Sequence, residues 1–300
     1  MNTREITNLL DQEFRVRELG DPHLAKHALT DLGKAMANPS FIAEQSGLLF
    51  DFAAEVEKVY CTVFTTELVI EQILRLAQGP AMLFTHHPHD YHEDERGMGA
   101  FPESCLHTLR ARGISVYAIH APLDVGKRIS VSASLANRLG LQDAHPFFEE
   151  LEGHLGMAGM FDNCTLESLA ARVCGALEID STDVFDYGGR EGLVAVVAGG
   201  GDQVDILAQA NDIGCTTYIT GTAVHRWNRP SIQEGNRKFH DYAREHRINL
   251  IGASHNNTEK CAVQDVASFL CGKGVPASYL VDPDLDRYDI GNRRWKKGCN

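Results

Sequence analysis

From residue 58 onward, short β-rich runs alternate with longer helical patterns, and this alternation constrains the fold more than any other feature of the chain. In such sequences each helix carries the chain back to the edge of the sheet where the previous strand began, so the next strand runs parallel to it. The alternation therefore predicts an α/β protein built on parallel sheets.

The same rhythm occurs twice. The first half is expected to run strand 59–64, helix 68–77, strand 81–85, helix 103–112 and strand 115–119. The second half is expected to run strand 193–198, helix 203–213, strand 217–220, helix 236–247 and strand 249–252. Only the order of strands and helices repeats, because the amino-acid sequences of the two halves show no significant identity to each other. Two similar α/β domains are the expected organisation.

The segment 145–161 separates the halves and contains Gly153, Gly156 and Gly159. Closely spaced glycines favour a turn-rich crossing over a helix. We place the domain boundary there, with a first domain over residues 1–145 and a second over 146–300. Whether the C-terminal segment packs back on the first domain is left open. Helical pattern resumes at Thr165, which suits a helix start.

The charge balance argues against two classes of partner. The 300 residues contain 28 Lys and Arg against 41 Asp and Glu, a formal net charge of −13. Such an acidic surface repels nucleic-acid phosphates and anionic lipid over most of its area. We expect a small-molecule substrate rather than nucleic acid or a membrane.

The N-terminus and the cysteines indicate the compartment. No apolar run approaches the roughly 20 residues of a membrane span, and residues 1–14 resemble a short amphipathic helix rather than a secretory signal. The eight cysteines are scattered and form no CxxC pair. We expect a cytoplasmic protein with reduced cysteines.

Imidazoles and carboxylates follow the predicted strands. In open parallel sheets, ligands bind outside the carboxyl ends of the strands. The polar residues at these ends are His86, His87, His120, Asp124, His225, His255 and Glu259. Such groups bind borderline transition metals, and the absence of thiolates argues against a closed structural zinc site.

Five of these residues form the predicted ligand set: His86, His87, Asp124, His255 and Glu259. They are too many for one zinc ion with an open position, but they suit two ions that share a carboxylate and a water molecule. His255 and Glu259 would face the same way across one helical turn. Each motif alone is weak evidence for a metal site, since an adjacent pair of histidines more often belongs to a polar loop.

Other polar motifs have simpler interpretations. His89, His92 and the acids of HDYHEDE are expected to form a solvated loop. The run AGGGDQV can present backbone N–H groups to an anion, but a tight turn with Asp202 as N-cap is slightly favoured. Because Val204 stands where a third glycine belongs, no dinucleotide cofactor is expected.

At these residues the chain resembles the Nif-three-like dinuclear metal-centre family, homologues of the type-two GTP cyclohydrolase. The resemblance covers about residues 47–130 and 190–282 and rests on FTHHP, YAIHAPLD, VAVVAGGGD with YITG, and LIGASHNNTE. It implies the same five metal ligands. It also implies two α/β domains facing one another across a metal-bearing cleft, and assembly as a homohexamer.

The chain departs from the family pattern at several positions. AEQSGLLFDF replaces a Trp-Asp-Asn segment before the first strand, and Thr222 stands where an acidic or basic residue is usual. Substrate identity is therefore the least transferable property.

The resulting hypothesis is a metal-dependent hydrolase, a cyclohydrolase or phosphoesterase, acting on a nucleotide-like or phosphorylated molecule. His120 and His225 are the candidate proton shuttles or substrate contacts, and a hydrogen bond to a ligand carboxylate is an equal alternative. Zn, Fe, Mn, Co and Ni fit the ligands equally. The rival hypothesis is a non-enzymatic metal-binding scaffold or metal-trafficking protein.

Overall fold

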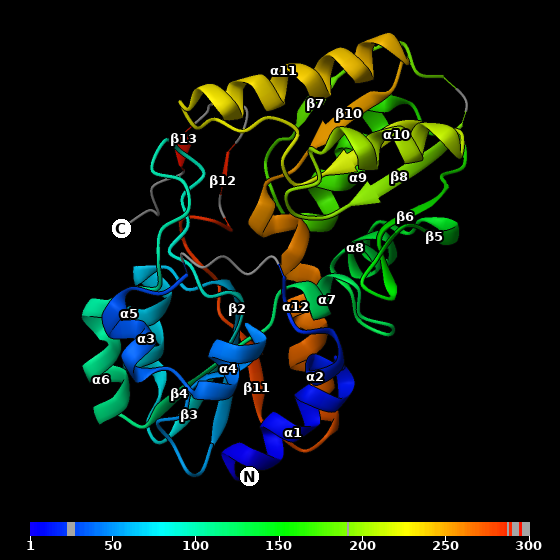
Figure 1. The fold of residues 1–300 in the computed structure, drawn as a ribbon. Helices are drawn as coiled ribbons and strands as arrows, with labels where there is room; N and C mark the ends of the chain where they lie inside the picture. Colours follow the sequence, from blue (N-terminus) through cyan, green and yellow to red (C-terminus); the bar gives the residue numbers. More distant parts are fainter. Residues whose placement is uncertain (23–27, 191, 287, 290–293, 296–300) are drawn as a thin grey trace. The chain divides into compact units, whose positions relative to one another are not determined.

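A computed structural model describes residues 1–22, 28–190, 192–286, 288–289 and 294–295 (Figure 1). The chain divides into two compact units, each with its own sheet, which confirms the predicted α/β class. Unit 1 comprises Met1–His92, Arg96–Ile129 and Val263–Asp282, and unit 2 comprises Glu93–Glu95, Ser130–Ala262 and Pro283–Asn300.

This division differs from a single boundary at residue 145. The chain enters unit 2 at Ser130, because α8 (Val131–Leu139) packs against strands of that unit. The Ser132 hydroxyl, for example, donates to the carbonyl of Leu155 and accepts from the N–H of Ala198. Residues 263–282 belong to unit 1, where β11 (Ala277–Tyr279) pairs with the sheet.

The sheet of unit 1 has the order β1-β4-β3-β2-β11. Its strands are β1 (Gly47–Phe50), β2 (Lys58–Phe64), β3 (Ala81–His87), β4 (Ile114–Ala118) and β11. The three predicted strands β2, β3 and β4 are its parallel centre. The sequence did not indicate β1 and β11, which have four and three residues and are too short for a periodic signal.

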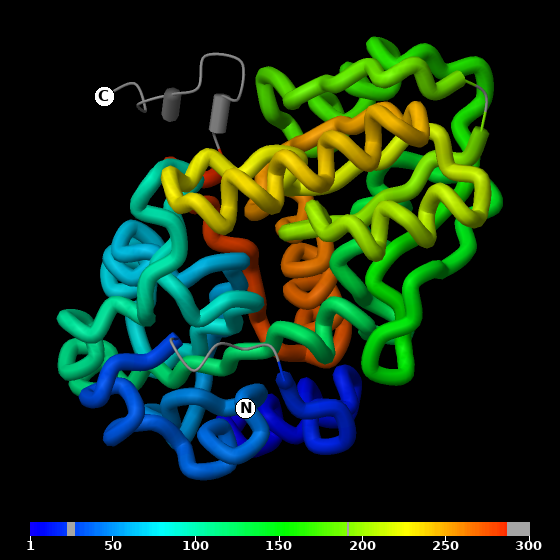
Figure 2. The backbone as a smooth tube through the Cα atoms, turned by 45° about the horizontal axis from the view of Figure 1, so that its top comes forward, coloured from blue at the N-terminus to red at the C-terminus, as the bar shows by residue number. Residues whose placement is uncertain are grey.

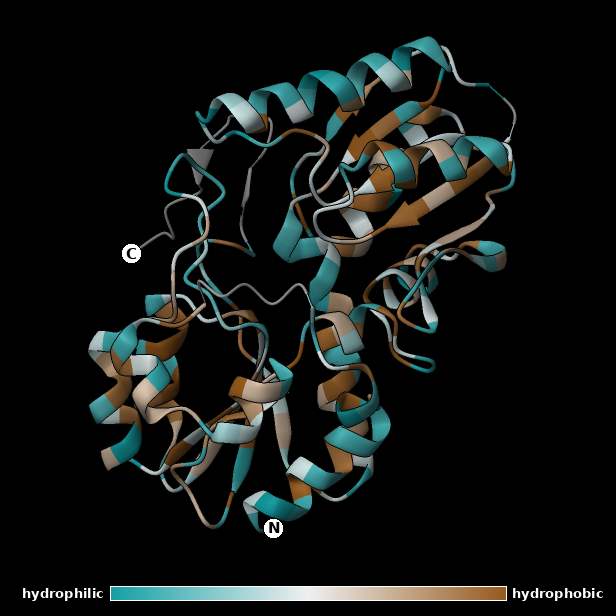
Figure 3. Cartoon of the chain, viewed as in Figure 1, coloured by the Kyte–Doolittle hydropathy of each residue, from teal (hydrophilic) through white to brown (hydrophobic). Residues whose placement is uncertain are grey.

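Helices cover the sheet of unit 1. They are α1 (Thr3–Glu13), α2 (Val16–Leu19), α3 (Asp31–Met36), α4 (Pro39–Glu44), α5 (Glu67–Leu76), the 3₁₀ turn η1 (Glu103–Cys105), α6 (Leu106–Ala111) and α7 (Ala121–Asp124). One face buries Leu83 and Val116 among side chains of α5 and α6. On the other face, the Tyr117 hydroxyl donates to Asp11 of α1 at 2.9 Å. Figure 3 shows the apolar strands of each unit in brown.

The sheet of unit 2 has the order β5-β6-β8-β9-β10-β7. Its strands are β5 (Gln142–Glu150), β6 (Gly153–Met160), β7 (Asp183–Phe185), β8 (Leu193–Val197), β9 (Cys215–Thr220) and β10 (Asn249–Gly252). The predicted strands β8, β9 and β10 form the parallel centre. They correspond closely to the ranges expected from the sequence.

The predicted turn-rich crossing was wrong, because residues 142–160 form the antiparallel hairpin β5–β6. Its glycines allow close approach rather than turning: a Cβ on Gly156 would lie 2.3 Å from the Phe147 ring. The connection is Leu151–Glu152, with φ values of 46° and 60°. Such hairpin turns normally carry Asn-Gly or Asp-Gly, so the sequence lacked the usual signal.

Five helices complete the larger elements: α8, α9 (Leu166–Leu177), α10 (Val204–Asp212), α11 (Pro230–Glu245) and α12 (His255–Gly272), the last of which crosses the division between the units. Helices α10 and α11 lie together in unit 2 (Figure 2), where Phe239 packs edge-on against Tyr218. Thr165 caps α9 as predicted. The N-cap of α10 is Gln203, not the predicted Asp202. A two-stranded pair, β12 (Tyr288–Asp289) and β13 (Arg294–Trp295), lies near the C-terminus in sequence.

The seven cysteines within the described ranges are free thiols. Burial raises the pKa of Cys215 to about 12, as expected for a thiol that acts as a small apolar side chain. None of the helices in the described part of the chain has the length and hydropathy needed to cross a membrane.

Candidate metal centre

The carboxyl edge of the unit 1 sheet carries three imidazoles and one carboxylate. Strand β3 ends with His86 and His87, and His120 precedes the short helix α7, which ends at Asp124. Strands β3 and β4 are parallel, with Thr85 opposite Ala118, so the residues that follow both strands emerge at the same level. His86 is fully buried and His87 is 3% exposed.

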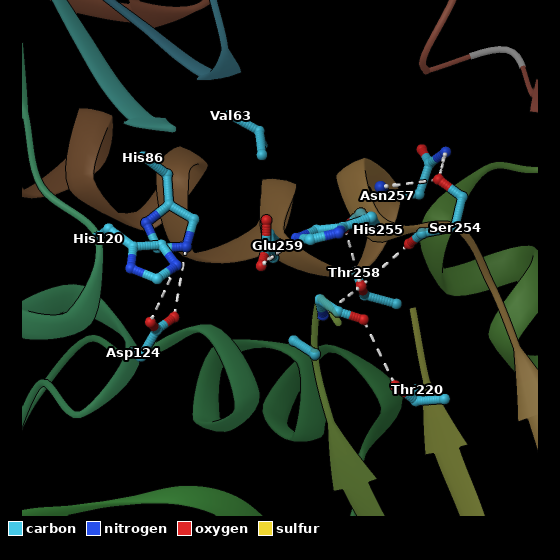
Figure 4. A network of polar contacts seen from close by, with 12 residues as sticks. Val63, His86, His120, Asp124, Thr220, Ser254, His255, Asn257, Thr258 and Glu259 are labelled. Carbon is cyan, nitrogen blue, oxygen red and sulfur yellow. Dashed lines mark hydrogen bonds and ion pairs between the residues drawn. The ribbon is translucent and has the colours of Figure 1, made fainter. Parts of the chain in front are cut away.

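The backbone fixes the ring of His86. Its Nδ1 lies 2.9 Å from the carbonyl oxygen of Ile119, so Nδ1 carries the proton and donates it. Nε2 then presents a lone pair, and it lies 3.3 Å from Oδ1 of Asp124 (Figure 4). A histidine held through one nitrogen and directed through the other has the arrangement of a metal ligand.

His120 is held in a similar way by a side chain. Its Nδ1 lies 3.1 Å from Oδ2 of buried Asp21, which also accepts the N–H of Ala121 at 2.8 Å. Its Nε2 lies 3.7 Å from Oδ2 of Asp124. Burial lowers the pKa of His120, but the carboxylates of Asp124 and Asp21 outweigh it, so the net pKa is raised.

The three imidazoles form one cluster. One ring nitrogen from each of His86, His87 and His120 lies within 4.8 Å of the others. The ring of His87 stacks on Phe64 with 4.5 Å between centroids. Sequence reasoning expected His120 at this edge as a proton shuttle, a substrate contact or a hydrogen-bond partner of a ligand carboxylate, and the geometry is equally compatible with a ligand role. The four-residue spacing of His120 and Asp124 was the sequence signal that could have indicated a ligand role for His120.

In unit 2, His255 and Glu259 lie one turn apart on α12. His255 Nε2 is 3.1 Å from Oε1 of Glu259, so both point the same way, as the spacing predicted. Ser254 precedes the helix with φ +70°, and its Oγ accepts from the N–H of Asn257 at 3.2 Å and from its Nδ2 at 3.0 Å (Figure 4). This cap fixes where the first turn begins.

The glycine turn after β8 lies directly against this pair. Gly199 has φ +71°, and a Cβ there would lie 2.1 Å from Oε1 of Glu259 and 3.3 Å from Nε2 of His255. Its N–H donates to the Thr258 hydroxyl at 3.0 Å. The run AGGGDQV is thus a tight turn whose missing side chain leaves room for a carboxylate.

The loop HDYHEDE was expected to be solvated, and this was wrong for its first part. His89 is 4% exposed and Tyr91 is 1% exposed, with Tyr91 stacked on Phe64 at 4.1 Å. Glu93, which belongs to unit 2, accepts the backbone N–H of His255 at 3.2 Å. Sequence reasoning missed this role because the partner lies 162 positions away in the chain.

The remaining predicted site residue, His225, pairs with Asp202 in unit 2. His225 Nε2 lies 3.3 Å from Oδ1 of Asp202, and both side chains are partly exposed. Both residues follow parallel strands of the sheet, β9 and β8. A hollow of about 960 Å³ lies at the opposite, amino edge of these strands, lined by residues such as Thr217, Arg190 and Asn249. It is separate from the groups described above.

The fold and these donor groups define a class of α/β proteins with a candidate transition-metal site. The family model described as Duf34/NIF3 (NGG1p interacting factor 3) matches residues 34–275, and the chain belongs to this family.

Relatives support the assignment. The chain is 23% identical over 248 residues to a protein of Deinococcus radiodurans named GTP cyclohydrolase 1 type 2 homolog, covering 79% of this chain and 85% of that protein. It is 26% identical over 234 residues to a Pyrococcus horikoshii protein of the same name, covering 76% and 86%. A solved structure, the protein ybgI of unknown function, has a similar fold with TM-score 0.69 and 20% identity, covering 95% and 100%.

The close approach of Gly199 to the Glu259 carboxylate yields a testable prediction. Gly199→Ala should displace the Glu259 carboxylate and lower the bound metal per chain, because both the positive φ and the 2.1 Å approach exclude a Cβ. Gly200→Ala is the matched control, since its Cβ would meet only His255 Cε1 at 3.6 Å. Elemental analysis of the two variants checks this. Equal metal content in both would show that the close approach has no consequence for binding.

Proposed function

We propose that the chain is a dinuclear-metal-dependent hydrolase of a small nucleotide-like or phosphorylated substrate. The observation that carries the proposal is the imidazole cluster of unit 1, in which His86 and His120 direct Nε2 toward Asp124 while their Nδ1 atoms are held by other groups. Solvent-exposed histidines rarely need such fixed ring orientations, whereas metal ligands do.

The donor set fits two divalent ions. His86, His87, Asp124, His255 and Glu259 are the proposed ligands, and His120 joins them on the strength of its place in the cluster. Imidazole and carboxylate groups accept Zn, Fe, Mn, Co or Ni, with availability deciding among them. The Duf34/NIF3 membership supports the same residues, because they stand in the motifs on which the resemblance rests.

Two divalent ions held together lower the pKa of a water molecule toward neutrality and stabilise negative charge on the attacked group. The protein residues do the rest: Asp21 orients His120, and the Gly199 turn leaves space for the Glu259 carboxylate. The reacting atom would be the imidazole carbon of guanine in a ring opening, or phosphorus in a phosphoester. The names of the relatives favour the first.

A substrate screen tests the proposal. Nucleotides including GTP, phosphodiesters and pterin precursors are incubated with metal-loaded and metal-stripped protein, and products are followed by chromatography. We expect turnover of at least one class that depends on metal. Bound metal without any turnover would favour the rival function, a metal-binding scaffold or metal-trafficking protein.

The number of metal ions per chain is a direct prediction of the proposed function. The purified chain should hold about two transition-metal ions, and His86→Ala or Glu259→Gln should lower that number while the far-ultraviolet circular dichroism stays unchanged. His107→Ala, on the exposed side of α6, is the control and should retain full occupancy. Wild-type metal content in both site variants would remove the proposed centre.

The role of His120 separates into two measurable effects. As a ligand, its replacement in His120→Ala should weaken metal affinity by about 10- to 100-fold or more. As a proton shuttle, its replacement should lower kcat by about 10²- to 10⁴-fold at saturating metal. The cluster geometry favours the first effect. Metal titration followed by turnover at saturating metal distinguishes them, and full retention of both properties would exclude His120 from the site.

Family resemblance also supports a closed homo-oligomer, with a hexamer favoured. Light scattering at micromolar concentration should then give about six times the 33.1 kDa chain mass. A monomeric particle would contradict the assembly without affecting the proposed ligands of one chain.

A further inference from the structure

The first turn of α12 has a second polar face besides the one that carries His255 and Glu259. Residues three or four positions apart in a helix share a face. His255 and Glu259 therefore lie together on one side of the turn, which faces Gly199. Asn257 and Lys260 lie together on another side. They are 0% and 6% exposed, so this second face is buried.

Lys260 brings an ammonium group to the buried face. Its Nζ donates to the carbonyl of Leu177 at 2.6 Å and to Oδ1 of Asn257 at 2.8 Å. Oδ1 of Asp286 lies 3.6 Å from the same Nζ. Leu177 is the last residue of α9, where carbonyl groups lack partners within the helix and the helix dipole favours a cation. Two acceptors and a paired carboxylate thus offset the cost of burying this charge.

Asn257 joins the same face to the C-terminal segment. Its Nδ2 donates to the carbonyl of Leu285 at 3.0 Å and to the Oγ of Ser254 at 3.0 Å. Leu285 and Asp286 are themselves buried, at 2% and 8% exposed. Residues 283–286 belong to unit 2, as the first turn of α12 does, and they lie beyond the residues that the family model matches. The turn is therefore bonded on its second face to a segment outside the matched range.

We propose that Asn257, Lys260 and residues 283–286 form a C-terminal clamp that positions His255 and Glu259. The clamp residues are positioning residues, because they bond the turn on a face other than the one that carries the two proposed ligands. The inference rests on the proposed function, since it adds outer supports to the same metal centre. Groups that orient metal ligands from outside typically contribute about 10- to 100-fold to metal affinity.

Titration of the full-length protein with Co²⁺ tests the clamp. Lys260→Met should weaken Co²⁺ affinity by about 10- to 100-fold. By charge alone, removing a cation one residue from Glu259 would tighten Co²⁺ binding, so weaker binding identifies an effect on position. Lys273→Met, the same substitution at an exposed residue just after α12, is the matched control and should stay within a few-fold of wild type. Affinity in Lys260→Met equal to or tighter than wild type overturns the clamp.

A milder variant covers the case in which Lys260→Met yields little folded protein. Asp286→Asn keeps the size of the side chain and removes the charge paired with Lys260. It should weaken Co²⁺ affinity more than Asp284→Asn, which makes the same charge change at an exposed position of the segment. Equal affinities in these two variants would show that only net charge matters, and would overturn the clamp.

Amide hydrogen exchange of the metal-free protein tests the clamp without reference to metal. Asp286→Asn should speed exchange in a peptide covering residues 255–262 by about tenfold, because the turn loses a support on its buried face. Exchange in α11 should stay unchanged, and circular dichroism checks that the variant is folded. Unchanged exchange in residues 255–262 contradicts the clamp.

The outcomes separate the clamp from the hydrolase. Faster exchange in the first turn with weaker Co²⁺ binding supports the clamp even when no substrate is turned over. Faster exchange with unchanged Co²⁺ affinity overturns the positioning role, and the proposed metal centre then stands without it. A wild-type chain that binds no metal refutes the metal centre, and the exchange result alone then decides whether the clamp holds the turn.

Discussion

The chemistry of this protein depends on one constraint: parallel strands end at a common edge, so the residues that follow them meet. In unit 1, Thr85 of β3 lies opposite Ala118 of β4. His86 follows Thr85 directly, and His120 follows Ala118 after one intervening residue, Ile119. In unit 2, Thr220 of β9 lies opposite both Val197 and Gly252, so the turns after β8, β9 and β10 emerge together. Backbone register thus gathers side chains that are far apart in sequence.

Besides the strand register, the carboxyl edge of the unit 2 sheet requires glycine where its turns approach helix α12. The turn at Gly199 and the residue Gly221 both approach α12, where a Cβ on Gly221 would lie 2.5 Å from the Thr258 hydroxyl oxygen. Close backbone approach lets Thr258 accept from the Gly199 N–H. The helix that carries His255 and Glu259 is therefore seated on two strand-end turns rather than projecting freely from the sheet.

The sequence was informative where a signal was local and repetitive. Strand-helix alternation predicted β2, β3, β4, β8, β9 and β10, and residue spacing predicted that His255 and Glu259 face the same way. It failed where a contact between distant segments decides the structure. Gly156 looked like a turn residue, but Phe147 on the neighbouring strand requires its missing side chain. Glu93 looked solvated, but the N–H of His255 binds it.

The two histidines of unit 1 that approach Asp124 differ in how they are held, and the difference bears on how the site can vary. His86 is oriented by the carbonyl of Ile119, a backbone group that no side-chain substitution removes, so its tautomer follows directly from the register of β3 and β4. His120 is oriented by the carboxylate of Asp21, which substitution can alter. The ring of His86 is therefore determined by the fold itself, whereas the basicity and orientation of His120 can be tuned by one distant residue.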